Sequence, residues 1–181
     1  MPKLEKVYYV HVDSPVGQLL LAATDKGLRC LHFNRGSSPQ PGRNQVWIEC
    51  ESALQPYRNQ LDAYFRGELE EFTFPLDLVG TAFQKKCWEA LRRIPYGTTC
   101  SYAELARAVG SPRGFRAVGQ ANHTNPVAIV VPCHRVIGSN GSLTGYGGGM
   151  EIKEKLLSLE GVSLQQHLRF GENRSPVRAR S

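Results

Sequence analysis

The most informative segment of the chain is Val127-Ala128-Ile129-Val130-Val131-Pro132-Cys133-His134-Arg135-Val136. Its first five residues are apolar and mostly β-branched, and a short run of this kind predicts a buried strand. Pro132 lacks a backbone N–H donor and would end the pairing of that strand. We therefore expect Cys133 at the end of a strand, on a turn, with His134 and Arg135 directly after it.

Cys133 has the neighbours that a reactive thiol requires. A free thiol with a pKa of about 8.5 is mostly protonated at neutral pH, so a catalytic cysteine needs a base, a positive charge or a helix N-terminus nearby. His134 and Arg135 are the candidates in the sequence. The alternative is an inert core cysteine, because cysteine is often buried and adjacent side chains on a strand point to opposite faces.

The composition is that of a globular protein with a basic surface. The 181 residues suffice for one large domain or two small ones, and the net charge of +6 favours a polyanionic partner such as nucleic acid. The five cysteines are widely spaced and odd in number, which predicts no disulfide framework and no zinc ribbon and fits a reducing cytosol. We find no secretion signal and no run approaching the ~20 apolar residues of a membrane span.

The first 80 residues read as a small α+β unit. Three strand-like runs separated by turns predict an antiparallel meander; they cover residues 7–12, 18–23 and 28–33. Residues 34–44 read as a loop, and residues 51–65 as a helix that Gly67 ends. A further strand is expected over Glu71-Phe72-Thr73-Phe74, before a domain boundary near Gly80.

After Gly80 the pattern becomes helical. Thr81-Ala82-Phe83-Gln84 and Ser101-Tyr102-Ala103-Glu104 are capping boxes, each of which predicts the start of a helix. Gly110 ends the second of these helices, and Ser111 with Pro112 predicts the start of a third. The last two helices, joined by a tight turn, form a helix-turn-helix arrangement.

The third helix, roughly residues 112–123, has two different faces. Its polar stripe carries Arg113, Arg116, Gln120 and His123, with Phe115 and Val118 on the opposite side. Small residues lie between them, namely Gly114, Ala117, Gly119 and Ala121. This pattern favours close approach to a nucleic-acid groove, and an ordinary solvated face remains the alternative.

A final helix is expected over Glu151 to Leu159, closed by Glu160-Gly161 and packed behind the reactive turn. The basic tail from Gly171 to Ser181 lacks periodicity, which predicts disorder and a nonspecific attraction to phosphate.

With these motifs in place, the chain resembles the O6-alkylguanine-DNA alkyltransferase family. The resemblance rests on the Pro132–Val136 motif, Arg116-Ala117-Val118-Gly119, Asn125-Pro126 and Tyr146 with Gly148-Gly149, and extends weakly to Asp13-Ser14-Pro15-Val16-Gly17. It implies an α+β fold with an RNase H-like domain over residues 1–80 and a winged-helix-type domain over residues 81–170, followed by the 171–181 tail.

The resemblance also implies a reaction. The cysteine thiolate displaces the alkyl group from O6 of guanine in DNA, with O4 of thymine as an open second substrate, and each molecule works once. No cofactor and no metal are implied. The expected partner is double-stranded DNA containing O6-alkylguanine, with no membrane, no obligate protein partner and a monomeric state, in the cytoplasm or at the nucleoid.

By the same resemblance, Cys133 is the alkyl acceptor, His134 is a base acting through a bridging water, and Glu160 orients the imidazole. Tyr102 donates toward N3 of the leaving guanine, and Asn125 braces the turn. Without the family, Glu160 would be a surface acid at a helix end, Tyr102 a core aromatic and Asn125 part of an ordinary Asn-Pro turn.

The family pattern also implies which residues contact the DNA and which line the pocket for the base. Arg116 is the residue that enters the base stack in place of the extruded nucleotide. The other residues expected at the DNA are Arg113, Ala117, Gly119 and Gln120, and those expected in the pocket are Val136, Tyr146, Gly147 and Gly148.

The chain departs from the family pattern at three positions. Phe115 replaces a small residue before the arginine, Ala128 replaces a proline and Gly147 replaces a serine, which leaves the preferred alkyl group open. The zinc ligands of some members have no equivalents. The rival functions are a non-catalytic lesion sensor, which would lack Cys133, a cysteine hydrolase that turns over, and a sequence-specific transcription regulator.

Overall fold

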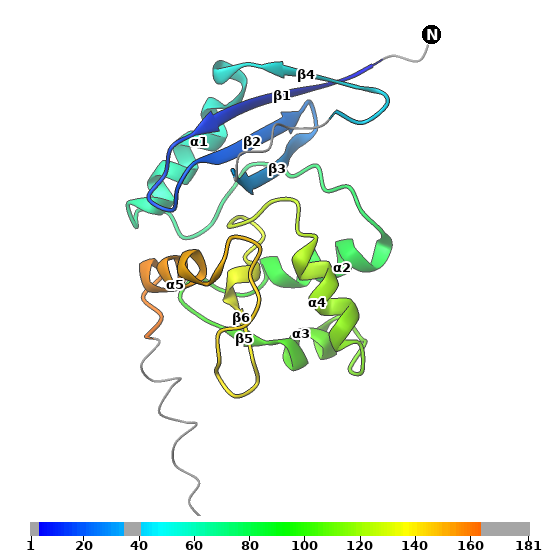
Figure 1. Cartoon of the computed structure of the whole chain (residues 1–181), viewed down its shortest axis with the longest axis vertical. Helices are drawn as coiled ribbons and strands as arrows, with labels where there is room; N and C mark the ends of the chain where they lie inside the picture. Colours follow the sequence, from blue (N-terminus) through cyan, green and yellow to red (C-terminus); the bar gives the residue numbers. More distant parts are fainter. Residues whose placement is uncertain (1–3, 35–40, 164–181) are drawn as a thin grey trace, which may run out of the picture.

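The computed structural model describes residues 4–34 and 41–163. Figure 1 shows two stacked units, with a sheet and one helix at one end and the remaining helices at the other. The predicted tail 171–181, the expected domain end at residue 170 and most of the predicted loop 34–44 lie outside the described residues. None of the helices in the described part of the chain is long and apolar enough to cross a membrane.

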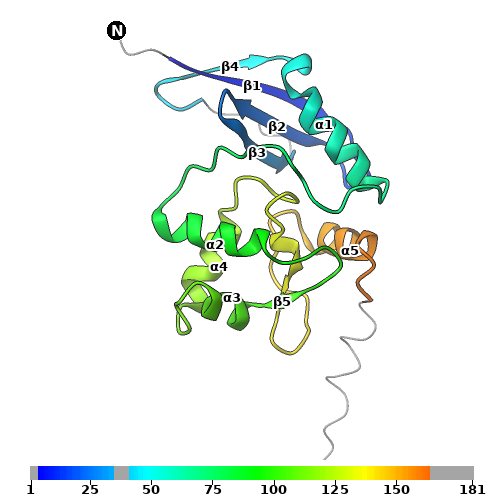
Figure 2. The ribbon, with the colours of Figure 1, turned by 180° about the vertical axis from the view of Figure 1, so that it is seen from behind.

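The first unit is a four-stranded sheet covered by a helix. Its elements are β1 (Glu5–Val12), β2 (Leu19–Thr24), β3 (Gly27–Phe33), β4 (Gln45–Glu49) and α1 (Glu51–Phe65). The order is β3-β2-β1-β4, so the predicted antiparallel meander is confirmed. β4 adds a parallel edge strand that was not predicted. β2 is buried along its whole length, and α1 packs on β1 and β2 (Figure 2).

The predicted strand over residues 71–74 is wrong. This segment crosses between the two units without pairing, and its aromatic rings pack instead: Phe74 contacts Tyr57 and Phe72 contacts Tyr64. The backbone N–H of Thr73 donates to the side chain of Gln60 at 2.9 Å rather than to a strand. The apolar alternation therefore reflects packing of a linker against α1.

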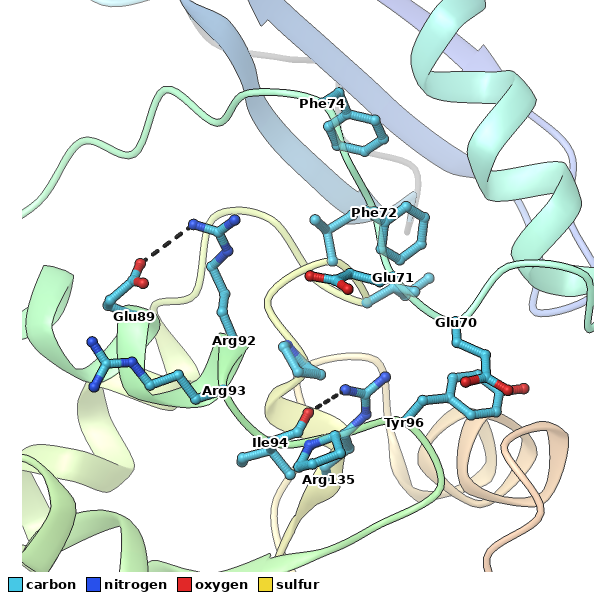
Figure 3. Close-up of a pocket in the computed structure, with 14 residues that line it drawn as sticks. Glu70, Glu71, Phe72, Phe74, Glu89, Arg92, Arg93, Ile94, Tyr96 and Arg135 are labelled. Atoms are coloured by element: carbon cyan, nitrogen blue, oxygen red, sulfur yellow. Dashed lines mark hydrogen bonds and ion pairs between the residues drawn. The ribbon is translucent and has the colours of Figure 1, made fainter.

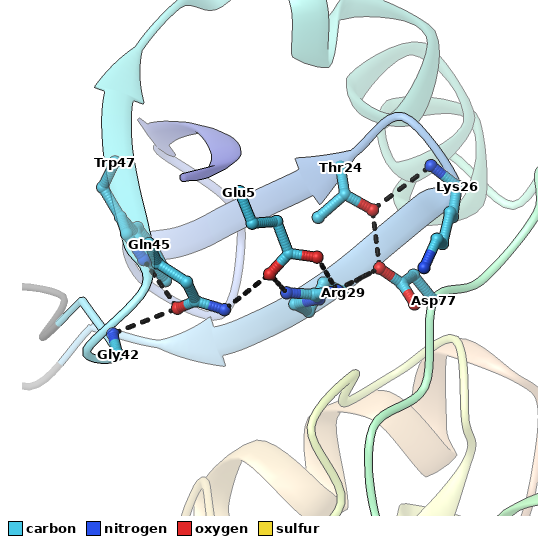
Figure 4. A network of polar contacts seen from close by, with 8 residues as sticks. All are labelled: Glu5, Thr24, Lys26, Arg29, Gly42, Gln45, Trp47 and Asp77. Carbon is cyan, nitrogen blue, oxygen red and sulfur yellow. Dashed lines mark hydrogen bonds and ion pairs between the residues drawn. The ribbon is translucent and has the colours of Figure 1, made fainter. Parts of the chain in front are cut away.

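A half-buried arginine joins this linker to the sheet (Figure 4). Arg29 on β3 donates to Glu5 on β1 at 2.8 Å and to Asp77 of the linker at 2.5 Å. Thr24 donates its hydroxyl to the same Asp77 oxygen at 2.6 Å. Because the linker is held at Asp77, the point where the chain enters the second unit is fixed relative to the sheet.

The second unit consists of short helices around a two-stranded parallel ribbon. Its elements are α2 (Ala82–Arg92), β5 (Cys100–Ser101), α3 (Tyr102–Ala108), α4 (Phe115–His123), the 3-10 turn η1 (Cys133–Arg135), β6 (Val136–Ile137) and α5 (Met150–Leu159). Both predicted capping boxes are confirmed, at Thr81 with Gln84 and at Ser101 with Glu104. α5 packs against η1, as expected.

The predicted start of the third helix is wrong by three residues. Ser111 and Pro112 form a turn closed by a hydrogen bond from Gly114 N–H to the Ser111 carbonyl at 2.8 Å. α4 therefore begins at Phe115, after Gly114 and without a side-chain cap. The helix-turn-helix arrangement of α3 and α4 remains, with a longer turn than expected.

The predicted strand over residues 127–131 is also wrong. The run is buried, but its backbone turns back on itself: Val131 N–H donates to the Val127 carbonyl at 2.9 Å, and Ile129 has a positive φ of 71°. Val127 alone forms a bridge, to Leu31 on β3. These β-branched side chains are buried because the loop packs between the two units, and they deliver Cys133 on a 3-10 turn.

Candidate active site

Cys133 lies at the first position of η1 and is 8% exposed. Asn125 holds the turn: its Nδ2 donates to the Val131 carbonyl at 2.7 Å and to Cys133 Sγ at 3.1 Å, and its Oδ1 accepts from Val127 N–H at 3.0 Å. Burial raises the pKa of the Cys133 thiol, and the bond from Asn125 acts in the opposite direction. The amide thus fixes the position of the sulfur and favours its charged form.

His134 is fully buried beside the thiol-bearing residue. Its Nε2 lies 2.7 Å from Glu160 Oε1, and its Nδ1 has no partner among the described residues. Because an ionised carboxylate only accepts, the proton belongs on Nε2 and Nδ1 is left as a free acceptor. Burial lowers the pKa of His134 and Glu160 opposes that effect, which suits a neutral base.

Glu160 joins three elements in one buried network. Besides His134, it accepts from Arg135 at 2.9 and 3.0 Å and from the Tyr64 hydroxyl at 2.7 Å. Burial by itself would raise the pKa of Glu160, but the bonds from His134 and Arg135 lower it to about 2. Glu160 is therefore an ionised acceptor, and Tyr64 brings α1 of the first unit into contact with it.

Arg135 does not supply the positive charge expected beside the thiol. Its guanidinium donates hydrogen bonds to Glu160 at 2.9 Å and to the Ile94 carbonyl at 2.6 Å. The cation that acts on the sulfur is Lys153 on α5, whose charge lowers the pKa of Cys133. Lys153 is not among the site residues predicted from the sequence, although its position on the same helical face as Leu156 was a signal.

Lys153 is fully buried and has no carboxylate partner among the described ion pairs. Its Nζ donates to the Val136 carbonyl at 2.6 Å and to the Thr144 carbonyl at 2.7 Å. Burial lowers the pKa of Lys153 to about 8. Lys153 therefore connects β6 to the loop before Tyr146 through these two hydrogen bonds, and it places a positive charge near the thiol.

Two cavities meet at Cys133. One, of about 190 Å³, extends toward His32, Phe33 and Ala128, and the other, of about 360 Å³, extends toward Tyr102 and Gly119. Both are lined by Asn122, His123, Cys133, Tyr146 and Gly147, and Gly148 lines the first. The space around the sulfur is therefore open from two sides.

The predicted pocket residues have different positions. Tyr146, Gly147 and Gly148 line the cavities, but Val136 does not: it is fully buried in β6 and contributes its carbonyl to Lys153. Val136 therefore supports the pocket from behind.

A larger cavity, of about 600 Å³, lies on the other side of the reactive turn (Figure 3). It is bordered by the linker and the end of α2, and its walls carry acids and bases together, with Glu71 and Arg92 among them. Arg135 forms part of its wall, but Cys133 does not reach it. Its size alone does not make it the reaction site.

The residues expected at DNA lie on α4 except Arg113, which was predicted on this helix and lies instead in the turn before it. Arg113, Arg116, Ala117 and Gln120 are exposed, whereas Gly119 is half-buried and lines the cavity that also contains Tyr102 and Cys133. Phe115 was expected on the side of Val118. Val118 is buried, but Phe115 is 50% exposed next to Arg116 because it is the first residue of the helix.

Within residues 4–34 and 41–163 no group of three or more His, Cys, Asp or Glu side chains is arranged to hold a metal ion.

Comparisons with known proteins agree with this arrangement. Residues 7–78 match the ribonuclease-like domain of 6-O-methylguanine DNA methyltransferase, and residues 82–162 match the DNA binding domain of the same protein. A methylated-DNA--protein-cysteine methyltransferase of Methanosarcina acetivorans is 49% identical over 155 residues, covering 86% of this chain and 99% of the relative. Its counterpart in Mycolicibacterium paratuberculosis is 51% identical over 154 residues, covering 85% and 92%.

Solved structures give the same result. The O6-methylguanine methyltransferase of Mycobacterium tuberculosis has a TM-score of 0.76 at 48% identity, covering 85% of this chain and 92% of that one. The same organism's OGT in complex with DNA has a TM-score of 0.78 at 44% identity, covering 90% and 99%. The α+β fold therefore combines a ribonuclease-like domain with a DNA-binding domain, and the chain belongs to the 6-O-methylguanine DNA methyltransferase family.

Proposed function

We propose that this chain repairs DNA by transferring the alkyl group from O6 of guanine to Sγ of its own Cys133. The observation that carries the proposal is the position of the thiol: it lies where two cavities meet, next to a histidine with a free ring nitrogen. In the transfer, a sulfur–carbon bond forms and the carbon–O6 bond breaks. The thiol proton ends on the restored guanine, and the thioether leaves no acceptor for a second alkyl group.

The buried network supplies the proton transfers. His134 Nδ1 takes the proton of Cys133 through a bridging water, and Glu160 stabilises the imidazolium that results. Lys153 stabilises the thiolate through its charge. Tyr102, which lines the cavity on the α3 side, donates to the departing base as negative charge develops on it.

The exposed face of α4, together with Arg113 in the turn before it, is the proposed contact with double-stranded DNA. Arg113 and Gln120 contact the backbone and groove, while Ala117 and Gly119 allow close approach. Arg116 stacks in the gap that the extruded base leaves, which offsets part of the few kcal/mol that extrusion costs. Binding of this kind suits the minor groove, where the base pairs are hard to distinguish. A protein that binds there can find lesions in any sequence.

We further propose that the protein acts as a monomer, without an obligate protein partner, in the cytoplasm or at the nucleoid. Residues 1–80 and 81–170 are the proposed domains, because the linker held at Asp77 enters α2 at this point. The Tyr64 hydroxyl bonded to Glu160 makes the first domain a structural support of the reaction site.

The test is an intact mass measurement after incubation with duplex DNA that contains one O6-methylguanine. We expect a mass gain of one methyl group, mapped to Cys133, with one lesion repaired per protein molecule. The Cys133→Ser variant should bind the same duplex without gaining mass. Tight binding with an unchanged wild-type mass would instead identify a lesion sensor, and multiple turnover on an ester would identify a hydrolase.

A further inference from the structure

Glu160 faces more hydrogen-bond donors than its two oxygens can serve equally well. Oε2 lies 2.9 Å from Arg135 Nε and 3.4 Å from the Gly97 backbone N–H. Oε1 lies 2.7 Å from the Tyr64 hydroxyl, 2.7 Å from His134 Nε2 and 3.0 Å from Arg135 Nη2. A carboxylate has about four lone-pair sites, fewer than these donors. The donors on Oε1 therefore compete for its charge.

The two shortest bonds to Oε1 come from different units of the protein. His134 lies on η1 next to the reactive thiol, whereas Tyr64 lies in the last turn of α1. A hydrogen bond to a carboxylate stabilises its negative charge. An oxygen whose charge is already stabilised by one donor attracts a second donor less strongly, so the Tyr64 bond weakens the bond to His134.

The position of Tyr64 is fixed by its neighbours. Its side chain is fully buried, and its ring packs against Phe65, Phe72 and Tyr96 with centroid distances of 5.4, 5.4 and 6.1 Å. Burial and the charge of Glu160 raise the pKa of the Tyr64 phenol. The phenol therefore keeps its proton at neutral pH and remains a donor to Glu160.

His134 must be neutral before the proposed transfer and charged during it. Its Nδ1 takes the thiol proton of Cys133, which a ring already protonated on Nδ1 cannot do. Burial lowers the pKa of His134, and the hydrogen bond and charge of Glu160 act against burial. A stronger interaction with Glu160 would raise the pKa of His134 and protonate the ring too early. The base therefore depends on how strongly Glu160 attracts it.

The other ionisable groups at this pair do not replace Tyr64. The groups that face Glu160 or His134 are Tyr64 on α1, Tyr96 after α2, Cys133 and Arg135 on η1, Tyr146 before α5 and Lys153 on α5. Arg135 and Lys153 lower the pKa of His134 through their charge. Tyr96 donates its hydroxyl to the Leu159 carbonyl at 3.2 Å. Among the described residues, Tyr64 is thus the phenol that donates to Glu160.

We propose that Tyr64 limits the attraction of Glu160 for the imidazolium, so that His134 stays neutral until the thiol delivers its proton. Tyr64 does not touch the reacting atoms and is a positioning residue that acts through Glu160. When Nδ1 takes the proton of Cys133 Sγ, the ring becomes a cation and its Nε2–H bond to Oε1 strengthens. This inference rests on the proposed function and gives the first domain a part in the proton transfer.

Loss of the phenol has a predicted direction. Without Tyr64, Oε1 interacts more strongly with the Nε2–H of His134, which stabilises the imidazolium and raises the pKa of His134. Methyl transfer then loses its base at a higher pH. A purely structural role would instead lower stability, or lower the rate by the same factor at every pH.

The test is the single-turnover rate of methyl transfer from duplex DNA that contains O6-methylguanine, measured between pH 5 and 9 at saturating DNA. In Tyr64→Phe the acid limb of the profile should lie about one pH unit higher than in the wild type, because a hydrogen bond to a charged group is worth about a tenfold change in an acidity constant. The plateau rate above the limb should be the same in both proteins.

Tyr57→Phe is the matched control, because Tyr57 lies on the same helix with its ring against Phe74 and the substitution is chemically identical. Its profile should superimpose on that of the wild type. Replacement of Tyr64 alone by 3-fluorotyrosine, a more acidic phenol and a stronger donor, should move the acid limb to lower pH. This variant keeps the hydrogen bond, so it provides the comparison if Tyr64→Phe does not fold.

The inference is refuted if the acid limb of Tyr64→Phe coincides with that of the wild type or lies at lower pH, or if the rate falls equally at every pH. An equal shift in Tyr57→Phe also refutes it. A wild type that transfers no methyl group at any pH overturns the proposed function itself, whereas transfer with an unmoved acid limb overturns the role of Tyr64 alone.

Discussion

Replacing Glu160 by glutamine should measure how much the buried network stabilises the protein. The pKa of Glu160 falls from 4.5 to about 2 when the chain folds. Each tenfold change in an acidity constant corresponds to about 1.4 kcal/mol, so the ionised carboxylate contributes about 3 kcal/mol at neutral pH. Loss of the charge also leaves Arg135 buried without its anion, and removal of one partner of a buried pair costs about 3–5 kcal/mol.

The pH dependence gives this prediction its sign. Because folding lowers the pKa of Glu160, the contribution of its charge to the free energy of unfolding is complete above pH 4.5 and is lost as the pH falls toward 2. The free energy of unfolding of the wild type should therefore exceed that of Glu160→Gln by about 3 kcal/mol at pH 7 and by about half of that at pH 3. In a chain of this size the difference at neutral pH lowers the thermal midpoint by about 6–12 °C.

The assay is urea unfolding at several pH values between 7 and 3, with two control variants. Glu151→Gln removes an exposed carboxylate paired with Lys155, and it should change stability by less than about 1 kcal/mol. Tyr64→Phe removes one hydrogen bond and keeps the charge, so a loss of about 1–3 kcal/mol without the pH dependence is expected. Parallel curves for the wild type and Glu160→Gln across the whole range would refute the reasoning.

Three further predictions concern the site and the DNA face. Lys153→Met removes the buried charge near the sulfur, so the pH profile for alkylation of Cys133 by a small reagent should move to higher pH; an unmoved profile would exclude a role for that charge. Arg116→Ala should slow repair of duplex DNA about 10- to 100-fold, in line with a few kcal/mol for extrusion, while transfer from the free O6-benzylguanine base is unchanged. Equal losses on both substrates would place Arg116 in the pocket. Phe115→Ala should weaken DNA binding in a titration but change stability by less than about 0.5 kcal/mol, because the ring is half exposed; unchanged affinity would show that the ring does not contact DNA.

Local signals in the sequence predicted much of the fold. The capping boxes at Thr81 and Ser101 are complete within four residues, and both helices start where these motifs place them. The alternation in residues 7–12 likewise corresponds to β1. In each case the interactions that define the element lie inside the motif, so no knowledge of the rest of the chain was needed.

The failures occurred where distant contacts decide the local structure. Residues 127–131 have the composition of a strand, but they are buried as a turn between the two units, with Val127 against Leu31. Phe72 and Phe74 alternate like strand residues because they pack on α1. An apolar pattern reports burial, and here the burial came from tertiary packing rather than from strand pairing.

Some residues of the site were predictable from the sequence and others were not. The family motif brought Cys133, His134, Asn125 and Glu160 to attention, and the structure brings them together. Tyr64 is separated from Glu160 by 96 positions, and no local pattern connects the two. Arg135 was expected at the thiol and instead bonds Glu160, because the direction of a side chain on a 3-10 turn is set by partners outside the turn.

The hydrogen bond between Tyr64 and Glu160 restricts how such proteins can be recombined. A crossover in the linker would separate two units that each have helices and strands of their own. It would interrupt none of these elements. A chimera with a foreign first unit that lacks this phenol would leave a buried carboxylate oxygen one donor short, next to the histidine that needs it. Chimeras that keep a tyrosine at this position of α1 should retain the network, so the two units are to be exchanged together or with Tyr64 preserved.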